Sequence, residues 1–124
     1  MRRLLLLAVL SPVVGCLAAP PDKLWVDQRT GVRAIPDPAR RADQLAAVCE
    51  SAAQAGDASA VKLILKDFAD DPRHDDLAGR CAGHLASHSH RAGRAVADTI
   101  NDDGKRKVAR DKVEATEEIE KAKS

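Results

Sequence analysis

The side chains best suited to chemistry are a cysteine and three histidines that lie close together in the chain: Cys81, His84, His88 and His90. If residues 77–85 are helical, Cys81, His84 and His88 share a face, because side chains three or four positions apart are neighbours on a helix. Imidazole nitrogens bind Zn²⁺, Ni²⁺ and Cu²⁺. This spacing allows a metal site made of His84, His88 and His90. The alternative is a set of surface histidines at a break between helices, because no second cysteine or carboxylate cluster completes the ligands.

The N-terminal segment has the pattern of a secretion signal. Arg2 and Arg3 form a short positive region, and an unbroken apolar run follows at residues 4–10. Even extended to Val14, the apolar stretch is shorter than the ~20 residues that a transmembrane helix needs. We therefore expect residues 1–15 to be a signal peptide, not a helix of the folded core.

The four residues Val13-Val14-Gly15-Cys16 resemble the lipobox of bacterial lipoproteins. In that pattern, two aliphatic or small residues and a glycine or alanine precede the cysteine that is acylated. The resemblance implies cleavage before Cys16, lipidation of its sulfur, and attachment to the membrane through acyl chains such as palmitate. Several acyl chains anchor a protein stably, since each buried CH₂ group contributes ~0.8 kcal/mol. The alternative is ordinary cleavage near Ala18 or Ala19, which would give a soluble secreted protein.

Two thiols remain once Cys16 carries lipid: Cys49 and Cys81. The space outside the cytoplasmic membrane is oxidising, so a disulfide between them is permitted. The bond would close a 32-residue loop and stabilise the fold by about 3–4 kcal/mol. Two buried free cysteines are the alternative, because neighbouring helix axes are often ~8–10 Å apart and a disulfide spans at most ~7 Å between Cα atoms.

The composition narrows the fold class and the function. A chain of 124 residues is at most one domain. Only 2% of its residues are aromatic while 44% are hydrophobic, mostly Ala, Leu and Val, which predicts helices around a thin core. The formal charge is +1, and loss of Arg2 and Arg3 with the leader would make it −1. A nucleic-acid binder needs a clear basic excess, so that class is excluded.

Caps and apolar spacing predict four helices between residues 37 and 103. Asp37-Pro38 opens the first, Gly56 ends it, and Asp57 caps the second. Asp71-Pro72 opens the third, residues 87–90 form a break, and residues 101–104 end the fourth. The larger side chains expected in the core are Leu45, Cys49, Val61, Ile64, Leu65, Phe68, Leu77, Cys81, Leu85, Val96 and Ile100.

These helices form a unit that occurs twice, with a shift of 32 residues. Leu45 and Cys49 fall on Leu77 and Cys81, and Phe68 falls on Ile100. The two units, 37–70 and 71–103, are predicted to be antiparallel helical hairpins. The order of small, aliphatic and acidic residues in 56–85 resembles that of HEAT and HEAT-like α-helical repeats. This resemblance implies protein–protein contact through a hairpin face. A plain four- or five-helix bundle is the alternative, because repeat arrays usually have at least three units.

The segments before and after the two hairpins are predicted to be a tether and a single charged helix. Residues 16–36 form a lipid-anchored tether in which Lys23–Asp27 and Val32–Ile35 could be short strands joined by a turn at Arg29-Thr30-Gly31. Residues 104–124 form a charged helix with a narrow apolar stripe. We expect this helix to cap the fold; a coiled-coil arm is the alternative. The stripe consists of Val108, Ala115, Ile119 and Ala122.

The sequence therefore predicts an all-α protein of the bacterial cell envelope, with its body in the periplasm or otherwise outside the cytoplasmic membrane. Its expected role is non-catalytic: a protein-binding or scaffold module whose partner is an unidentified envelope protein, with no cofactor. The alternative function is metal binding through His84, His88 and His90. No nucleophile motif or phosphate loop stands out, and the acidic pairs Asp70-Asp71 and Asp102-Asp103 are interpreted as helix caps. An enzyme is therefore not expected.

Overall fold

The computed structural model describes residues 19–123, and its regular structure there is entirely helical, which confirms the all-α prediction. The signal peptide and the lipidation site predicted at residues 1–16 lie outside these residues. The elements are α2 (Lys23–Arg33), α3 (Pro38–Gln54), α4 (Ala58–Leu65), a 3₁₀ turn η1 (Lys66–Phe68), α5 (His74–Ala86), α6 (His90–Ala97) and α7 (Asp103–Lys123).

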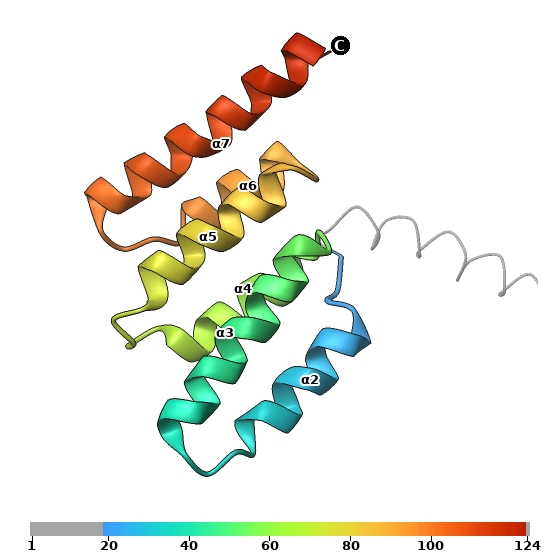
Figure 1. Ribbon diagram of the computed structural model, residues 1–124, viewed down its shortest axis with the longest axis vertical. Helices are drawn as coiled ribbons and strands as arrows, with labels where there is room; N and C mark the ends of the chain where they lie inside the picture. Colours follow the sequence, from blue (N-terminus) through green and yellow to red (C-terminus); the bar gives the residue numbers. More distant parts are fainter. Residues whose placement is uncertain (1–18, 124) are drawn as a thin grey trace, which may run out of the picture.

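The helices pack in two layers (Figure 1). In one layer α5 lies between α3 and α7, and in the other α4 contacts both α2 and α6. The two predicted hairpins are α3–α4 and α5–α6. One helix packs at each end of this pair: α2, which was not predicted, packs on α3, and the predicted charged helix α7 packs on α5 and α6. Each central hairpin therefore has a helix covering the face that its neighbour leaves open.

The two helices of the first hairpin, α3 and α4, are capped by the predicted residues. The Asp37 carboxylate accepts a hydrogen bond from the Ala39 N–H, and the Asp57 carboxylate accepts one from the Ala60 N–H. These bonds satisfy backbone donors that have no partner inside a helix. Gly56 turns the chain between the two helices with a φ of 85°, a conformation that side chains with a Cβ rarely adopt.

Two predicted boundaries are displaced. α5 begins at His74, not at Pro72, because the Asp71 carboxylate accepts the Arg73 N–H in a turn that precedes the helix. α6 ends at Ala97, and Gly104 lies inside α7 instead of ending α6. Neither shift changes which helices pair.

The predicted short strands near the N-terminus are wrong, because residues 23–33 form the helix α2. The Asp22 carboxylate accepts the Leu24 N–H and starts the helix. Helical spacing then places Trp25 and Val32 against the core, where both are partly buried. An isolated two-stranded hairpin is marginal in water, whereas the helix gains contact with α3.

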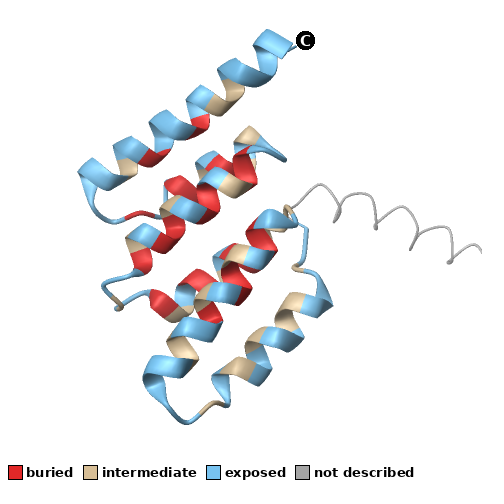
Figure 2. Cartoon of the chain, in the orientation of Figure 1, coloured by how far each residue is buried: buried red, intermediate tan, exposed pale blue. Residues whose placement is uncertain are grey.

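The core lies between the two layers (Figure 2). Its largest fully buried side chains belong to the predicted set: Phe68, Ile64, Leu77, Leu85, Ile100, Val61, Val96, Cys49 and Cys81, together with Val113. The α7 stripe was predicted in the wrong register. α7 buries Ala109 and Val113, while Val108 and Ile119 are 54% and 55% exposed.

None of the helices formed by residues 19–123 is long and apolar enough to cross a membrane.

Candidate functional site

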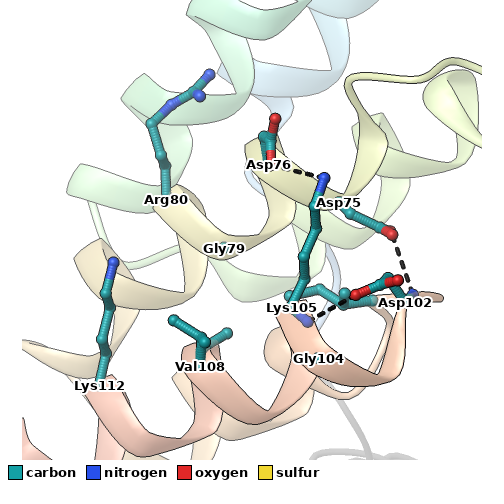
Figure 3. A pocket seen from close by; sticks show the side chains of 11 residues that line it. Asp75, Asp76, Gly79, Arg80, Asp102, Gly104, Lys105, Val108 and Lys112 are labelled. Atoms are coloured by element: carbon teal, nitrogen blue, oxygen red, sulfur yellow. Dashed lines mark hydrogen bonds and ion pairs between the residues drawn. The ribbon is translucent and has the colours of Figure 1, made fainter.

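A groove runs between the first halves of α5 and α7, with a cavity volume of about 610 Å³ (Figure 3). It forms where the two helices lie side by side in one layer. Gly79 leaves one wall open, since a Cβ atom added there would meet nothing within 4 Å. The lining residues are Asp75, Asp76, Gly79, Arg80, Ile100, Asp102, Gly104, Lys105, Val108, Ala109 and Lys112.

The middle of the groove is apolar. Ile100 and Ala109 are buried beneath it, with 2% and 4% of their surface exposed. Val108 lies on the α7 wall, and 54% of its surface is exposed. Among the described residues it is one of three large hydrophobic side chains that are exposed. An apolar channel with polar groups at its ends is a common form of binding site.

At one end of the groove, the charged side chains are already engaged with the protein. Lys105 and Asp76 form an ion pair across the groove with an N–O distance of 3.2 Å. The Asp75 carboxylate accepts the backbone N–H groups of Asn101 and Asp102 at 3.0 and 3.1 Å. Asp75 therefore holds the turn that leads into α7, and this turn shapes the groove.

The pKa of Asp75 is lowered from its ordinary value by this arrangement. Burial, the largest single influence, acts to raise it. The hydrogen bonds from the Asn101 N–H, the His74 ring and the Asp102 N–H act in the opposite direction and together prevail. The His74 ring Nδ1 lies 2.8 Å from Asp75, and because an ionised carboxylate only accepts, this nitrogen carries the proton.

The other end of the groove is cationic. Arg80 pairs with Glu50 of α3 at 3.2 Å, and the Arg80 side chain is still 53% exposed. Lys112 is exposed and has no carboxylate partner within residues 19–123. Figure 3 shows Lys112 on α7 and Arg80 on α5 at this end, with the Arg80 side chain pointing away from α7. A ligand that carries a negative charge next to an apolar group matches this half of the groove.

The structure brings the two predicted core cysteines together. Cys49 on α3 and Cys81 on α5 are both fully buried, and their sulfur atoms lie 3.5 Å apart. Both are free thiols in this structure. The hydrogen bond between them and their burial raise the pKa of the Cys49 thiol far above its ordinary value. Neither sulfur is open to a ligand, so the pair is not part of the groove.

The three histidines of the predicted metal site each lie against a different partner. His84 is 3.9 Å from Glu50, and the His88 Nε2 donates to the Gln54 carbonyl at 2.6 Å. The His90 Nδ1 is 3.8 Å from Glu117, while its buried Nε2 has no hydrogen-bond partner. Within residues 19–123, no group of three His, Cys, Asp or Glu side chains is placed to hold one metal ion.

The sequence did not single out the groove. The sequence predicts Val108 only as part of an apolar stripe, and it does not single out Lys112 or Arg80. The available signal was Gly79, a glycine inside a helix, which often marks a close approach or an open space. That signal becomes specific only when α7 is placed opposite it.

No protein-family model, no curated protein and no solved structure matches this chain.

Proposed function

We propose that this protein is a non-catalytic lipoprotein of the bacterial envelope, anchored through Cys16, that binds a segment of another envelope protein in the groove between α5 and α7. The groove is the observation that carries the binding role. The anchor rests on the lipobox-like residues 13–16 and the leader before them. A body held on a membrane with a groove open to a partner suits a scaffold or adaptor.

Binding is favoured over catalysis by the way the groove uses its charges. Asp75 holds a turn, and Asp76 neutralises Lys105. A general acid or base would need a free titratable group within hydrogen-bond reach of a substrate. The carboxylates here stabilise the walls of the groove instead, and a partner meets a preformed surface.

The chemistry of the groove indicates the kind of segment that fits. Its volume lies within the range of ordinary ligand pockets, ~300–1,000 Å³, and suits a few side chains of a peptide. An apolar side chain would cover Val108 and the buried surface beneath it. A carboxylate beside it would pair with Lys112, which lacks a partner within the described residues. An amphipathic helix with acidic flanks presents both kinds of group on one face.

Site-specific crosslinking in intact cells tests this proposal. A photoreactive amino acid placed at Val108 should form a discrete adduct with one envelope protein. Gly79→Leu should abolish the adduct, because the new side chain fills the open wall of the groove. It should not unfold α5, because leucine has a higher helix propensity than glycine and the space at Gly79 is empty.

Gly83→Leu is the matched control. Gly83 lies one turn further along α5, is exposed, has equally open space around it and does not line the groove. This variant should keep the adduct. Lys112→Glu should weaken it through charge repulsion. Loss of the adduct in both glycine variants, or its persistence in both, would contradict binding in this groove.

A further inference from the structure

The chain enters the folded body at one edge of the two-layer array, and hydrogen bonds fix that point. The Ser59 hydroxyl, in the first turn of α4, donates to the Ala19 carbonyl. The Asp22 N–H donates to the Asp57 carboxylate at 2.8 Å. Ala19 lines a hollow of about 860 Å³ together with residues at the starts of α2, α4 and α6. We name this surface the N-terminal edge and define it by Ala19, Leu24, Trp25, Lys62 and Arg91.

The distance between this edge and a lipid on Cys16 is short. Cys16 precedes Ala19 by three residues. Three residues span at most about 11 Å, whatever their conformation. If Cys16 is lipidated, as in the proposed function on which this step rests, Ala19 at the N-terminal edge is held within that distance of the lipidated residue.

The N-terminal edge carries apolar groups suited to a membrane interface. Leu24 is 52% exposed although it is a large hydrophobic side chain, and it lines the hollow. Trp25 is half-buried and lines the hollow beside it. Tryptophan is enriched at the level of lipid headgroups, because its ring has both an apolar body and a polar N–H group.

The same hollow presents two basic side chains suited to an anionic surface. Lys62 and Arg91 are exposed, and neither has a carboxylate partner within residues 19–123. The hollow also holds two carboxylates, whose negative charge faces backbone N–H groups at helix starts: Asp22 accepts the Leu24 N–H, and Asp57 accepts the Ala60 N–H. The helix N-termini at this edge add partial positive charge. Anionic lipids attract basic side chains held near their headgroups.

We infer that the N-terminal edge docks on the anionic surface of the membrane that holds the lipid anchor. Leu24 enters the headgroup region, the exposed part of Trp25 lies at the same level, and Lys62 and Arg91 pair with lipid phosphates. The helices α5 and α7 begin at the opposite edge of the array (Figure 1). Docking therefore turns the groove between them away from the bilayer, toward a partner.

Tryptophan fluorescence of the anchored protein tests this inference, because Trp25 is the only tryptophan of the chain. The protein is purified from membranes, and the mass of its N-terminal peptide reports whether Cys16 carries lipid. It is then reconstituted into vesicles of phosphatidylethanolamine and phosphatidylglycerol that contain a lipid with a nitroxide near its headgroup. Docking predicts strong quenching and a blue-shifted emission of Trp25, with less of both in phosphatidylcholine vesicles.

Reversing the charge of Lys62 and Arg91 distinguishes docking of the N-terminal edge from simple nearness to the bilayer through the anchor. Each basic side chain near an anionic surface changes binding roughly fivefold, so Lys62→Glu with Arg91→Glu should lower the docking equilibrium roughly twentyfold or more. Arg40→Glu with Lys66→Glu makes the same change in net charge at exposed residues outside this edge. This control should keep the wild-type quenching.

The outcomes distinguish the inference from the proposed function. A lipidated protein whose Trp25 is not quenched would overturn docking and leave the anchor intact. Equal loss of quenching in both double variants would also overturn it, because the effect would then follow net charge alone. A Cys16 without lipid would overturn the anchor and, with it, the tether argument for docking.

Discussion

The sulfur atoms of Cys49 and Cys81 lie 3.5 Å apart at the contact between α3 and α5. The two residues occupy equivalent positions of the two hairpins, and both are fully buried. A disulfide needs a sulfur separation of about 2.05 Å, so about 1.5 Å of further approach would form the bond. Both helices bury alanines in the same core, and these small side chains allow the helices to lie this close.

We expect Cys49 and Cys81 to be joined in the exported protein. The two thiols would give up two protons and two electrons to a disulfide-exchange oxidoreductase of the envelope. Exchange should precede closure of the core, because the thiolate is the reactive form and burial with hydrogen bonding raises the pKa of Cys49. The fragment that contains Cys49 and Cys81 should be lighter by two hydrogens than the same fragment of a leaderless chain made in the cytoplasm. Alkylation of both thiols without denaturant in the exported protein would contradict this prediction.

Glycines on facing helices give a matched pair of stability predictions. A Cβ at Gly93 of α6 would lie 2.8 Å from the Ala82 carbonyl oxygen and 3.0 Å from the Ala86 Cβ. Gly93→Ala should therefore destabilise the fold by about 1–3 kcal/mol. Gly83→Ala meets nothing within 4 Å and should stabilise it by about 0.5–1 kcal/mol through helix propensity. Urea unfolding monitored by circular dichroism measures both, and effects of the same sign would refute the close contact of α5 and α6.

The ion pair between Arg29 and Asp67 should hold α2 on the body. Two hydrogen bonds of 2.7 and 2.9 Å join them across 38 residues, and both side chains are less than 20% exposed. Asp67→Asn should cost about 1–3 kcal/mol, because Arg29 loses a buried charged partner. Asp27→Asn, which removes only the exposed pair with Lys23, should cost nearly nothing. A red shift of Trp25 emission confined to Asp67→Asn would report detachment of α2.

The pH dependence of stability should reveal Asp75. Its pKa is lower in the folded protein than in the unfolded chain. The stability it contributes is therefore complete above the unfolded value of ~3.9 and is lost as the pH falls through the folded value. The stability gap between wild type and Asp75→Asn should be constant from neutral pH down to about pH 5 and should narrow below about pH 4.

Asp43→Asn provides the control for this titration. Asp43 holds the equivalent position in the first hairpin and is exposed, and Arg73 is its one ion-pair partner among residues 19–123. Its gap to wild type should be small at every pH. Urea unfolding midpoints, measured at steps of ~1 pH unit, give the difference in stability between wild type and each variant. If this difference for Asp75→Asn does not change between pH 6 and the acid transition, the folded protein does not lower the pKa of Asp75.

The sequence alone determined the helical class, the two hairpins and most of the core. Helix caps such as Asp37 and Asp57 act on backbone groups two or three residues away, so their effect can be read locally. The apolar period is also local. The 32-residue shift made Cys49 and Cys81 equivalent before their distance was known.

Only the tertiary structure decided the rest. Residues 23–35 suit either two short strands joined by a turn or a helix, and the choice depends on partners far away, such as Asp67 for Arg29. The register of α7 was missed because a weak apolar stripe does not say which side meets α5. The groove is formed by Gly79 of α5 and Lys112 of α7 together with their neighbours. No local sequence pattern predicts that these two helices are in contact. Packing against a distant segment contributes free energy that intrinsic propensity does not contain, and it therefore overrides local preference.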